Sequence, residues 1–273
     1  MPNWVQTNLT ISGPADQLDT LAQILNGNNF SFKDIIPMPP PLDIPTGSDT
    51  DMALIYTCYE KYGAAVADVP DSILKDIDEF GFVGLWDPEN ERIAPNAQDV
   101  YENKIYKAKK MLSGMDDGPS DFTIPKASVE SITGYALNKR SLLAIGEMMR
   151  TNILNYGSST WYNWCRKNWG TKWDASDVEF RQEGNSHAIS LSFQTAWSVP
   201  MPIIEAMSKM YPKLEFNGEY ADENIGSNCG RFTLQNGNGS VVKPSKVDFA
   251  IRLACDVWGY DANIYLDEND KEE

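Results

Sequence analysis

The sequence predicts an α+β fold in which two sheet-forming ends enclose a mainly helical section. Up to residue 37, and again after residue 174, apolar and polar residues alternate as they do in half-buried strands. Between those positions, apolar residues recur at spacings of three and four, which is typical of one helix face. A chain of 273 residues with 42% hydrophobic residues can bury a substantial core, so we expect it to be folded.

The N-terminal end predicts a strand, a helix and a second strand. Residues 5–11 alternate between apolar and polar and favour a strand with one buried face. Residues 14–27 favour a helix, because proline suits a first helical turn and glycine often follows the last one. We predict the second strand at residues 30–36. The prolines that follow would end it, since proline cannot donate a hydrogen bond to a sheet.

The remaining elements are expected in two groups. Helical spacing covers residues 54–67, 72–80, 100–112 and 142–156. The C-terminal elements are strands near residues 178–180, 189–193, 214–216 and 232–234, a helix that opens at Pro202, a hairpin turn at residues 236–239 and a last helix capped by Ser245.

The order strand, helix, strand at each end is that of a ferredoxin-like sandwich. We therefore predict a ferredoxin-like sandwich that is split by an insertion. Residues 1–37 form its first part, residues 38–174 a mainly helical acidic insertion, and residues 175–273 its second part with a C-terminal helix.

Several segments of the chain have a distinctive amino-acid sequence. They are Met1 to Trp4 with Asn8 to Gly13, Trp161 to Trp173, Phe193 to Ser198, and the loop from Tyr220 to Gly230. These blocks resemble the YubB-type ferredoxin-like family of phage and plasmid proteins. The resemblance implies a ferredoxin-like domain and a mobile-element origin, and it brings no established reaction with it.

Composition excludes several kinds of protein. The cysteines, Cys58, Cys165, Cys229 and Cys255, form no C-x-x-C pair, and His187 is the single histidine, so we expect no metal site, no disulfide framework and no cofactor. No run of eighteen apolar residues and no signal-like start occur, so we expect no membrane contact and a cytoplasmic location.

Charge is the most informative feature. The chain has 39 acidic and 23 basic residues, and residues 1–100 alone have 16 acidic and 4 basic ones. Such a field attracts basic surfaces and repels nucleic acid. Aromatic residues among the carboxylates suit an interface anchor, although they could instead form a small core of the insertion, and the charge could serve solubility alone. The predicted partner-binding residues are Asp68, Asp71, Asp76, Asp78, Glu79, Phe82, Trp86, Asp87, Glu89 and Glu91.

Three functional hypotheses follow. The leading one is a non-enzymatic phage or plasmid accessory protein that binds a basic surface of a host protein, such as a defence component that grips nucleic acid, without binding nucleic acid itself. The second is a small-molecule or nucleotide-binding enzyme that uses the tryptophan-rich helix at residues 161–173 with Asp222 and Glu223. The third is a self-assembling structural protein whose sheet face makes the contact. We expect the tryptophans mainly to pack in a core.

Overall fold

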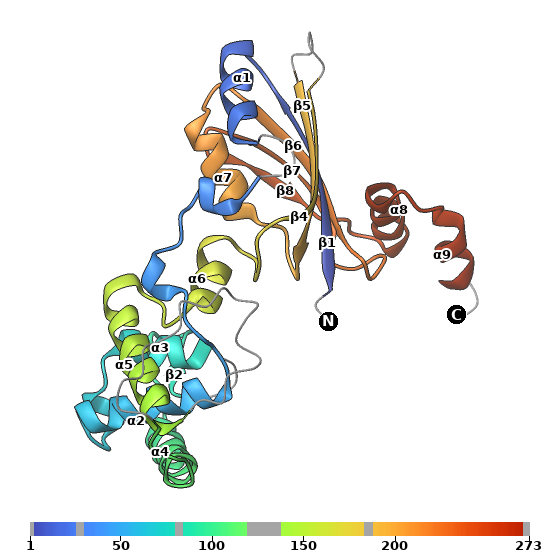
Figure 1. The fold of residues 1–273 in the computed structure, drawn as a ribbon. Helices are drawn as coiled ribbons and strands as arrows, with labels where there is room; N and C mark the ends of the chain where they lie inside the picture. Colours follow the sequence, from blue (N-terminus) through green and yellow to red (C-terminus); the bar gives the residue numbers. More distant parts are fainter. Residues whose placement is uncertain (1–2, 26–29, 80–83, 119–137, 183–187, 270–273) are drawn as a thin grey trace. The chain divides into compact units, whose positions relative to one another are not determined.

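The computed structural model describes residues 3–25, 30–79, 84–118, 138–182 and 188–269. It divides into two compact units (Figure 1). The sheet unit is Met1–Pro37 with Cys165–Glu273, and the helical unit is Met38–Trp164. The helical unit thus begins where the predicted insertion begins and ends before residue 174, because the boundary falls inside helix α6 (Trp161–Asn168).

The sheet unit contains a six-stranded antiparallel sheet with the order β4-β5-β1-β6-β7-β8. Its strands are β1 (Trp4–Ser12), β4 (Ser176–Gln182), β5 (Ala188–Ala196), β6 (Glu215–Asp222), β7 (Gly230–Gln235) and β8 (Asn238–Val242). Helix α1 (Ala15–Ile24) follows β1, and α7 (Met201–Met210) follows β5. This order gives the βαββαβ topology of a ferredoxin-like fold, which confirms the predicted α+β class.

The hairpin β7–β8 extends this sheet beyond the four strands that the ferredoxin-like order supplies. Asn236 and Gly237 form its two-residue turn, with φ angles of 51° and 73°. Positive φ at both central positions is the mark of a type I′ turn, whose twist matches that of the strands. The predicted hairpin turn is therefore correct.

The predicted strand at residues 30–36 is wrong. Its centre is a 3₁₀ helix, Phe32–Asp34. The Asp174 carboxylate accepts hydrogen bonds from the Phe32 amide at 2.7 Å and the Ser31 hydroxyl at 2.5 Å, and the Ile36 carbonyl accepts one from the Trp169 indole at 2.9 Å. Side chains thus form hydrogen bonds with backbone groups that, in a strand, would pair with a neighbouring strand. The strand that pairs with β5 in its place is β4, which follows the helical unit.

The two faces of the sheet differ. Along β1, Val5, Thr7, Leu9 and Ile11 are buried and alternate with the more exposed residues of the other face. Figure 1 shows α1 and α7 on one side of the sheet and α8 (Val247–Trp258) on the other.

The last helix, α9 (Ala262–Asn269), follows α8. Alpha8 begins at Val247 without a side-chain cap, so the predicted cap at Ser245 is wrong.

The helical unit has an apolar core of its own. Its elements are the short helices Pro40–Leu42 and Val66–Asp68, the helices α2 (Ser48–Tyr62), α3 (Asp71–Glu79), α4 (Ala97–Ser113) and α5 (Lys139–Tyr156), and the small hairpin of β2 (Trp86–Asp87) and β3 (Arg92–Ile93). Helices α2 and α5 approach closely at Gly146, where a Cβ atom would lie 2.6 Å from the Ala53 carbonyl. In the described part of the chain, no helix is long and apolar enough to cross a bilayer.

Candidate functional site

Two of the predicted partner-binding residues lie inside the helical unit. Asp76 is only 2% exposed, and its carboxylate accepts hydrogen bonds from the Ser159 amide and the Asn163 amide group, both at 3.2 Å. Trp86 is 7% exposed and belongs to the apolar core, with the Lys75 ammonium 4.4 Å from its ring centre. The expectation of an outward carboxylate is wrong for Asp76, whereas for Trp86 the alternative of a small core of the insertion is correct. Asp76 holds the start of α6 in place, and Trp86 packs in the core.

Two further predicted carboxylates bind their own loops. The Asp78 carboxylate accepts a hydrogen bond from the Leu85 amide at 2.8 Å. The Asp87 carboxylate accepts hydrogen bonds from the side chain and the backbone of Asn90, at 2.8 and 3.3 Å, and lies 3.6 Å from Arg92. The side-chain bond from Asn90 is the largest of several contacts that lower the pKa of Asp87. Both carboxylates therefore shape the segment around the β2–β3 hairpin.

The remaining predicted residues divide between exposed positions and positions outside the described part. Asp68, Asp71, Glu89 and Glu91 are exposed. Phe82 and the side chain of Glu79 lie outside the described residues, as does His187. The outward carboxylates thus follow two short segments, one around the start of α3 and one at the β2–β3 turn.

Sequence reasoning missed other carboxylates on the same unit. Asp99 and Glu102 of α4 are exposed, and Gln98 connects this helix to the segment before Asp68. The Gln98 side chain donates to Glu102 at 2.8 Å and to the Ala64 carbonyl at 2.9 Å. The helical spacing of Asp99 relative to the buried Tyr101 and Ile105 was the signal for its exposure, whereas spacing gave no such signal for Glu102.

The first part of the helical unit is therefore acidic at its surface. Among the described side chains of residues 43–102, eight carboxylates are exposed against three basic groups. The acidic ones are Asp49, Glu60, Asp68, Asp71, Glu89, Glu91, Asp99 and Glu102, and the basic ones are Lys61, Lys75 and Arg92. The two units have the same net charge, because residues 38–164 hold 19 acidic and 11 basic residues and the rest of the chain holds 20 and 12. Within the helical unit, the acidic excess thus lies in residues 43–102, and the sheet unit carries an equal net charge.

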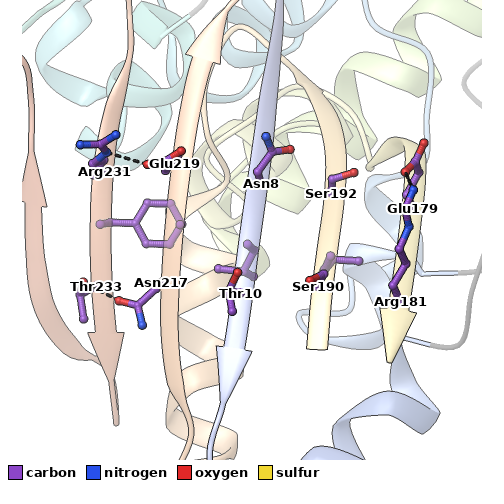
Figure 2. Close-up of a pocket in the computed structure, with 14 residues that line it drawn as sticks. Asn8, Thr10, Glu179, Arg181, Ser190, Ser192, Asn217, Glu219, Arg231 and Thr233 are labelled. Atoms are coloured by element: carbon purple, nitrogen blue, oxygen red, sulfur yellow. Dashed lines mark hydrogen bonds and ion pairs between the residues drawn. The ribbon is translucent and has the colours of Figure 1, made fainter. Parts of the chain in front are cut away.

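The sheet unit offers a different kind of site. The face of the sheet away from α1 and α7 forms an open groove of about 530 Å³ (Figure 2). Its floor consists of uncharged polar side chains, and the Glu179–Arg181 and Glu219–Arg231 ion pairs, at 3.0 and 2.6 Å, lie at its two sides. The floor residues are Asn8, Thr10, Ser190, Ser192, Asn217 and Thr233.

Helix α8 packs against the same face of the sheet, beside this groove. The Asn8 side chain donates a hydrogen bond to the Val257 carbonyl at 3.0 Å, and the Trp258 indole donates to the Ala221 and Asp222 carbonyls, both at 3.1 Å. The alternation of the strands placed these polar side chains on one face. Nothing in the sequence signalled that a helix returns to cover part of it.

The residues of the enzyme hypothesis have structural contacts. Asp222 is 5% exposed, and its carboxylate accepts hydrogen bonds from the Asn224 amide at 2.8 Å and the Asn3 side chain at 3.3 Å. The Glu223 amide donates to the Trp4 carbonyl at 2.8 Å. Trp161, Trp164 and Trp169 are buried, as core packing requires.

Two further observations concern metal-ligating side chains and thiols in the described residues. Within these ranges no three histidine, cysteine, aspartate or glutamate side chains come together as metal ligands would. All four cysteines are buried. Burial raises the pKa of Cys58 to about 12, which keeps its thiol protonated and unreactive at neutral pH.

One comparison with known protein families agrees with the ferredoxin-like topology. Residues 168–268 match the family model described as "Ferredoxin-like domain in Api92-like protein". This part of the chain is similar to that domain. A crystal structure of a protein Api92 from Yersinia pseudotuberculosis is 13% identical, with a TM-score of 0.38, and the alignment covers 90% of this chain and 100% of that chain. A comparison with curated proteins found no match.

Proposed function

We propose that the protein is a non-enzymatic accessory protein of a phage or plasmid, related to the YubB-type family, that binds a basic surface of a host protein in the cytoplasm. The partner class is a defence component whose basic surface normally grips nucleic acid, so the bound protein would inhibit it by presenting similar charge. The observation that carries the proposal is the excess of exposed carboxylates over exposed basic groups in residues 43–102.

Electrostatics favours this partner class. A cluster of exposed charges of one sign accelerates encounter with a surface of the opposite sign and repels surfaces of the same sign. The net charge of −16 extends this effect over the whole chain and opposes direct binding to nucleic acid. Because exposed carboxylates are remote from the core, their reversal changes stability by only about 0.5 kcal/mol each.

The test reverses four of these charges in the full chain. The variant combines Asp68→Lys, Asp71→Lys, Glu89→Lys and Glu91→Lys. The control variant reverses four exposed carboxylates of the sheet unit, Asp16, Asp19, Asp34 and Asp261, and so has the same net charge. Tagged forms of both variants and of the unchanged protein are used to capture partners from host lysate, with identification by mass spectrometry.

We expect the unchanged protein and the control variant to retain one host protein with a basic surface, and the four-residue variant to lose it. Binding of the purified partner should weaken as salt rises from 50 to 300 mM, because exposed charges are screened. Equal retention by both variants, or a retained partner without a basic surface, would refute the proposal.

A further inference from the structure

The two edges of the six-stranded sheet differ in protection. Edge strand β4 has an irregular register between Ser176 and Glu179, and Asp177 in that irregularity has a φ angle of 47°. Three of its seven residues are charged. Bulges and charges are the devices by which proteins keep a sheet edge from pairing with another chain. The β4 edge therefore has the features of a protected edge.

Edge strand β8 has neither device. Its sequence is Asn-Gly-Ser-Val-Val, its register with β7 is regular, and all five residues are exposed. Gln235 and Asn238 close a two-residue turn and so form a hydrogen-bonded pair, and bonding alternates along the strand. The amides of Gly239 and Val241 consequently point away from β7. They are available to a further strand.

A small groove lies next to this edge, on the side of α8. It has a volume of about 250 Å³ and apolar and basic lining residues. Val242 is 63% exposed and Phe249 is 58% exposed, although both are large apolar side chains. Grouped apolar exposure of this kind marks interaction surfaces. The lining residues are Arg231, Val242, Lys243, Pro244, Phe249, Arg252, Leu253 and Asp256.

The charge around the groove is opposite to that of the chain. Residues 231–252 contain four basic residues and one acidic residue, within a chain of net charge −16. Arg231, Lys243 and Arg252 line the groove, and the Lys246 ammonium lies 6.0 Å from the Phe249 ring. The opposing groups are Asp256 in the lining, Asp248 at the start of α8, and Glu219, which pairs with Arg231.

We propose that β8 and this groove bind an extended acidic segment of a partner protein. The segment adds a seventh strand beside β8 through the amides of Gly239 and Val241. An apolar side chain of the segment packs against Phe249 in the groove, and its carboxylates approach Lys243 and Arg252. Addition of a strand to an exposed sheet edge is a common mode of peptide recognition, in which backbone bonds give affinity and pockets give specificity.

Charge separates this occupant from the alternatives. Pairing of β8 with β8 of a second copy would bring the basic groups of both copies together, which is unfavourable. Nucleic acid would meet the repulsion of the whole chain. An acidic segment is attracted by the local basic groups, and its backbone carbonyls accept hydrogen bonds from the outward amides of β8. This inference is independent of the proposed function, since it concerns the opposite charge and the other unit.

The test uses a library of fluorescent ten-residue peptides that alternate aspartate or glutamate with valine, leucine or phenylalanine, and matched peptides with lysine at the acidic positions. Binding to the full chain is measured by fluorescence anisotropy. Hydrogen exchange reports whether the amides of residues 238–242 gain protection. Three variants are compared: Val241→Pro, Lys243→Glu with Arg252→Glu, and a control with Lys33→Glu and Lys167→Glu, whose side chains are exposed elsewhere.

We expect acidic peptides to bind and to protect β8, and lysine peptides to leave the amides of β8 unprotected. Val241→Pro removes one outward amide while it spares the bonds to β7, so binding should weaken roughly tenfold. The Lys243 and Arg252 double variant should weaken binding by a similar factor without altering the fold, and the control should bind normally. The inference is overturned if no acidic peptide binds at 1 mM, if lysine peptides protect β8 equally well, or if β8 is already protected in a dimer.

Discussion

Asp51 of α2 allows a sharp test of the electrostatics in the helical unit. Its carboxylate is partly buried, and its Oδ1 atom has no hydrogen-bond partner among the described residues. Burial raises the pKa of Asp51 from its ordinary value of 3.8 to about 7, and the nearby Asp76 adds to the increase. Lys104 opposes the increase, but burial also lowers the pKa of Lys104, so the attraction between the two groups does not compensate for desolvation.

The sign of the effect follows from proton binding. With its raised pKa, the folded protein binds a proton at Asp51 more tightly than the unfolded chain does. The free energy of unfolding therefore falls as pH rises from about 4 to about 7, and the loss is complete above the folded pKa. Three pKa units at about 1.4 kcal/mol each give a loss on the order of 4 kcal/mol.

Asp51→Asn removes this titration. We expect the variant to gain stability over the unchanged protein, and the gain should grow by about 2 kcal/mol between pH 5.5 and pH 8. Urea unfolding of the full chain at these two pH values measures the gain, and hydrogen exchange in α2 and α5 assigns it to the helical unit. The lower pH stays above the isoelectric point of about 4.5.

Asp49→Asn is the matched control. Asp49 lies in the same first turn of α2 but is exposed, so its substitution should change stability by less than about 0.5 kcal/mol at both pH values. A loss of stability in Asp51→Asn at pH 8 would show that the carboxylate is charged and stabilised by Lys104. That result would refute the argument from burial.

Two packing predictions complete the set. Gly146→Ala adds a Cβ atom 2.6 Å from the Ala53 carbonyl, so α2 and α5 must move apart. The variant should lose about 1–2 kcal/mol in urea unfolding despite the better helix propensity of alanine, and a gain of stability would contradict the close approach. Trp86→Ala should lower the free energy of unfolding by about 3–5 kcal/mol, as for a buried aromatic residue. A change below about 0.5 kcal/mol in the same measurement would contradict the burial of Trp86.

The fold was predictable where one face of an element is buried. Alternation in residues 5–11 identifies β1. The Asn236–Gly237 pair, whose residues adopt positive φ angles, identifies the β7–β8 turn. Both signals are local in the sequence. Residues 30–36 misled the prediction for the opposite reason. Their backbone is held by Asp174 and Trp169, more than a hundred positions away in the chain, and alternation carries no information about such partners.

The sequence predicted the negative charge of the candidate surface, but not which carboxylates are exposed on it. Asp68, Asp71, Asp76 and Asp78 look equivalent in the sequence, yet the first two are exposed, Asp76 is buried and Asp78 binds the Leu85 amide. The difference depends on which donors surround each carboxylate, and Ser159 and Asn163 are remote in sequence from Asp76. A count of charges therefore predicts an acidic region without naming its outward members.

The hairpin β7–β8 moves the free edge of the sheet to a strand that basic residues flank. In a four-stranded ferredoxin-like sheet β6 would be the edge, whereas here the edge moves outward to β8, which has no charged residue of its own. Basic residues flank this strand, and an acidic chain would otherwise repel any acidic segment that approached it. The local excess of positive charge is therefore what an acidic ligand requires at this edge, and simple solubility gives no reason for it.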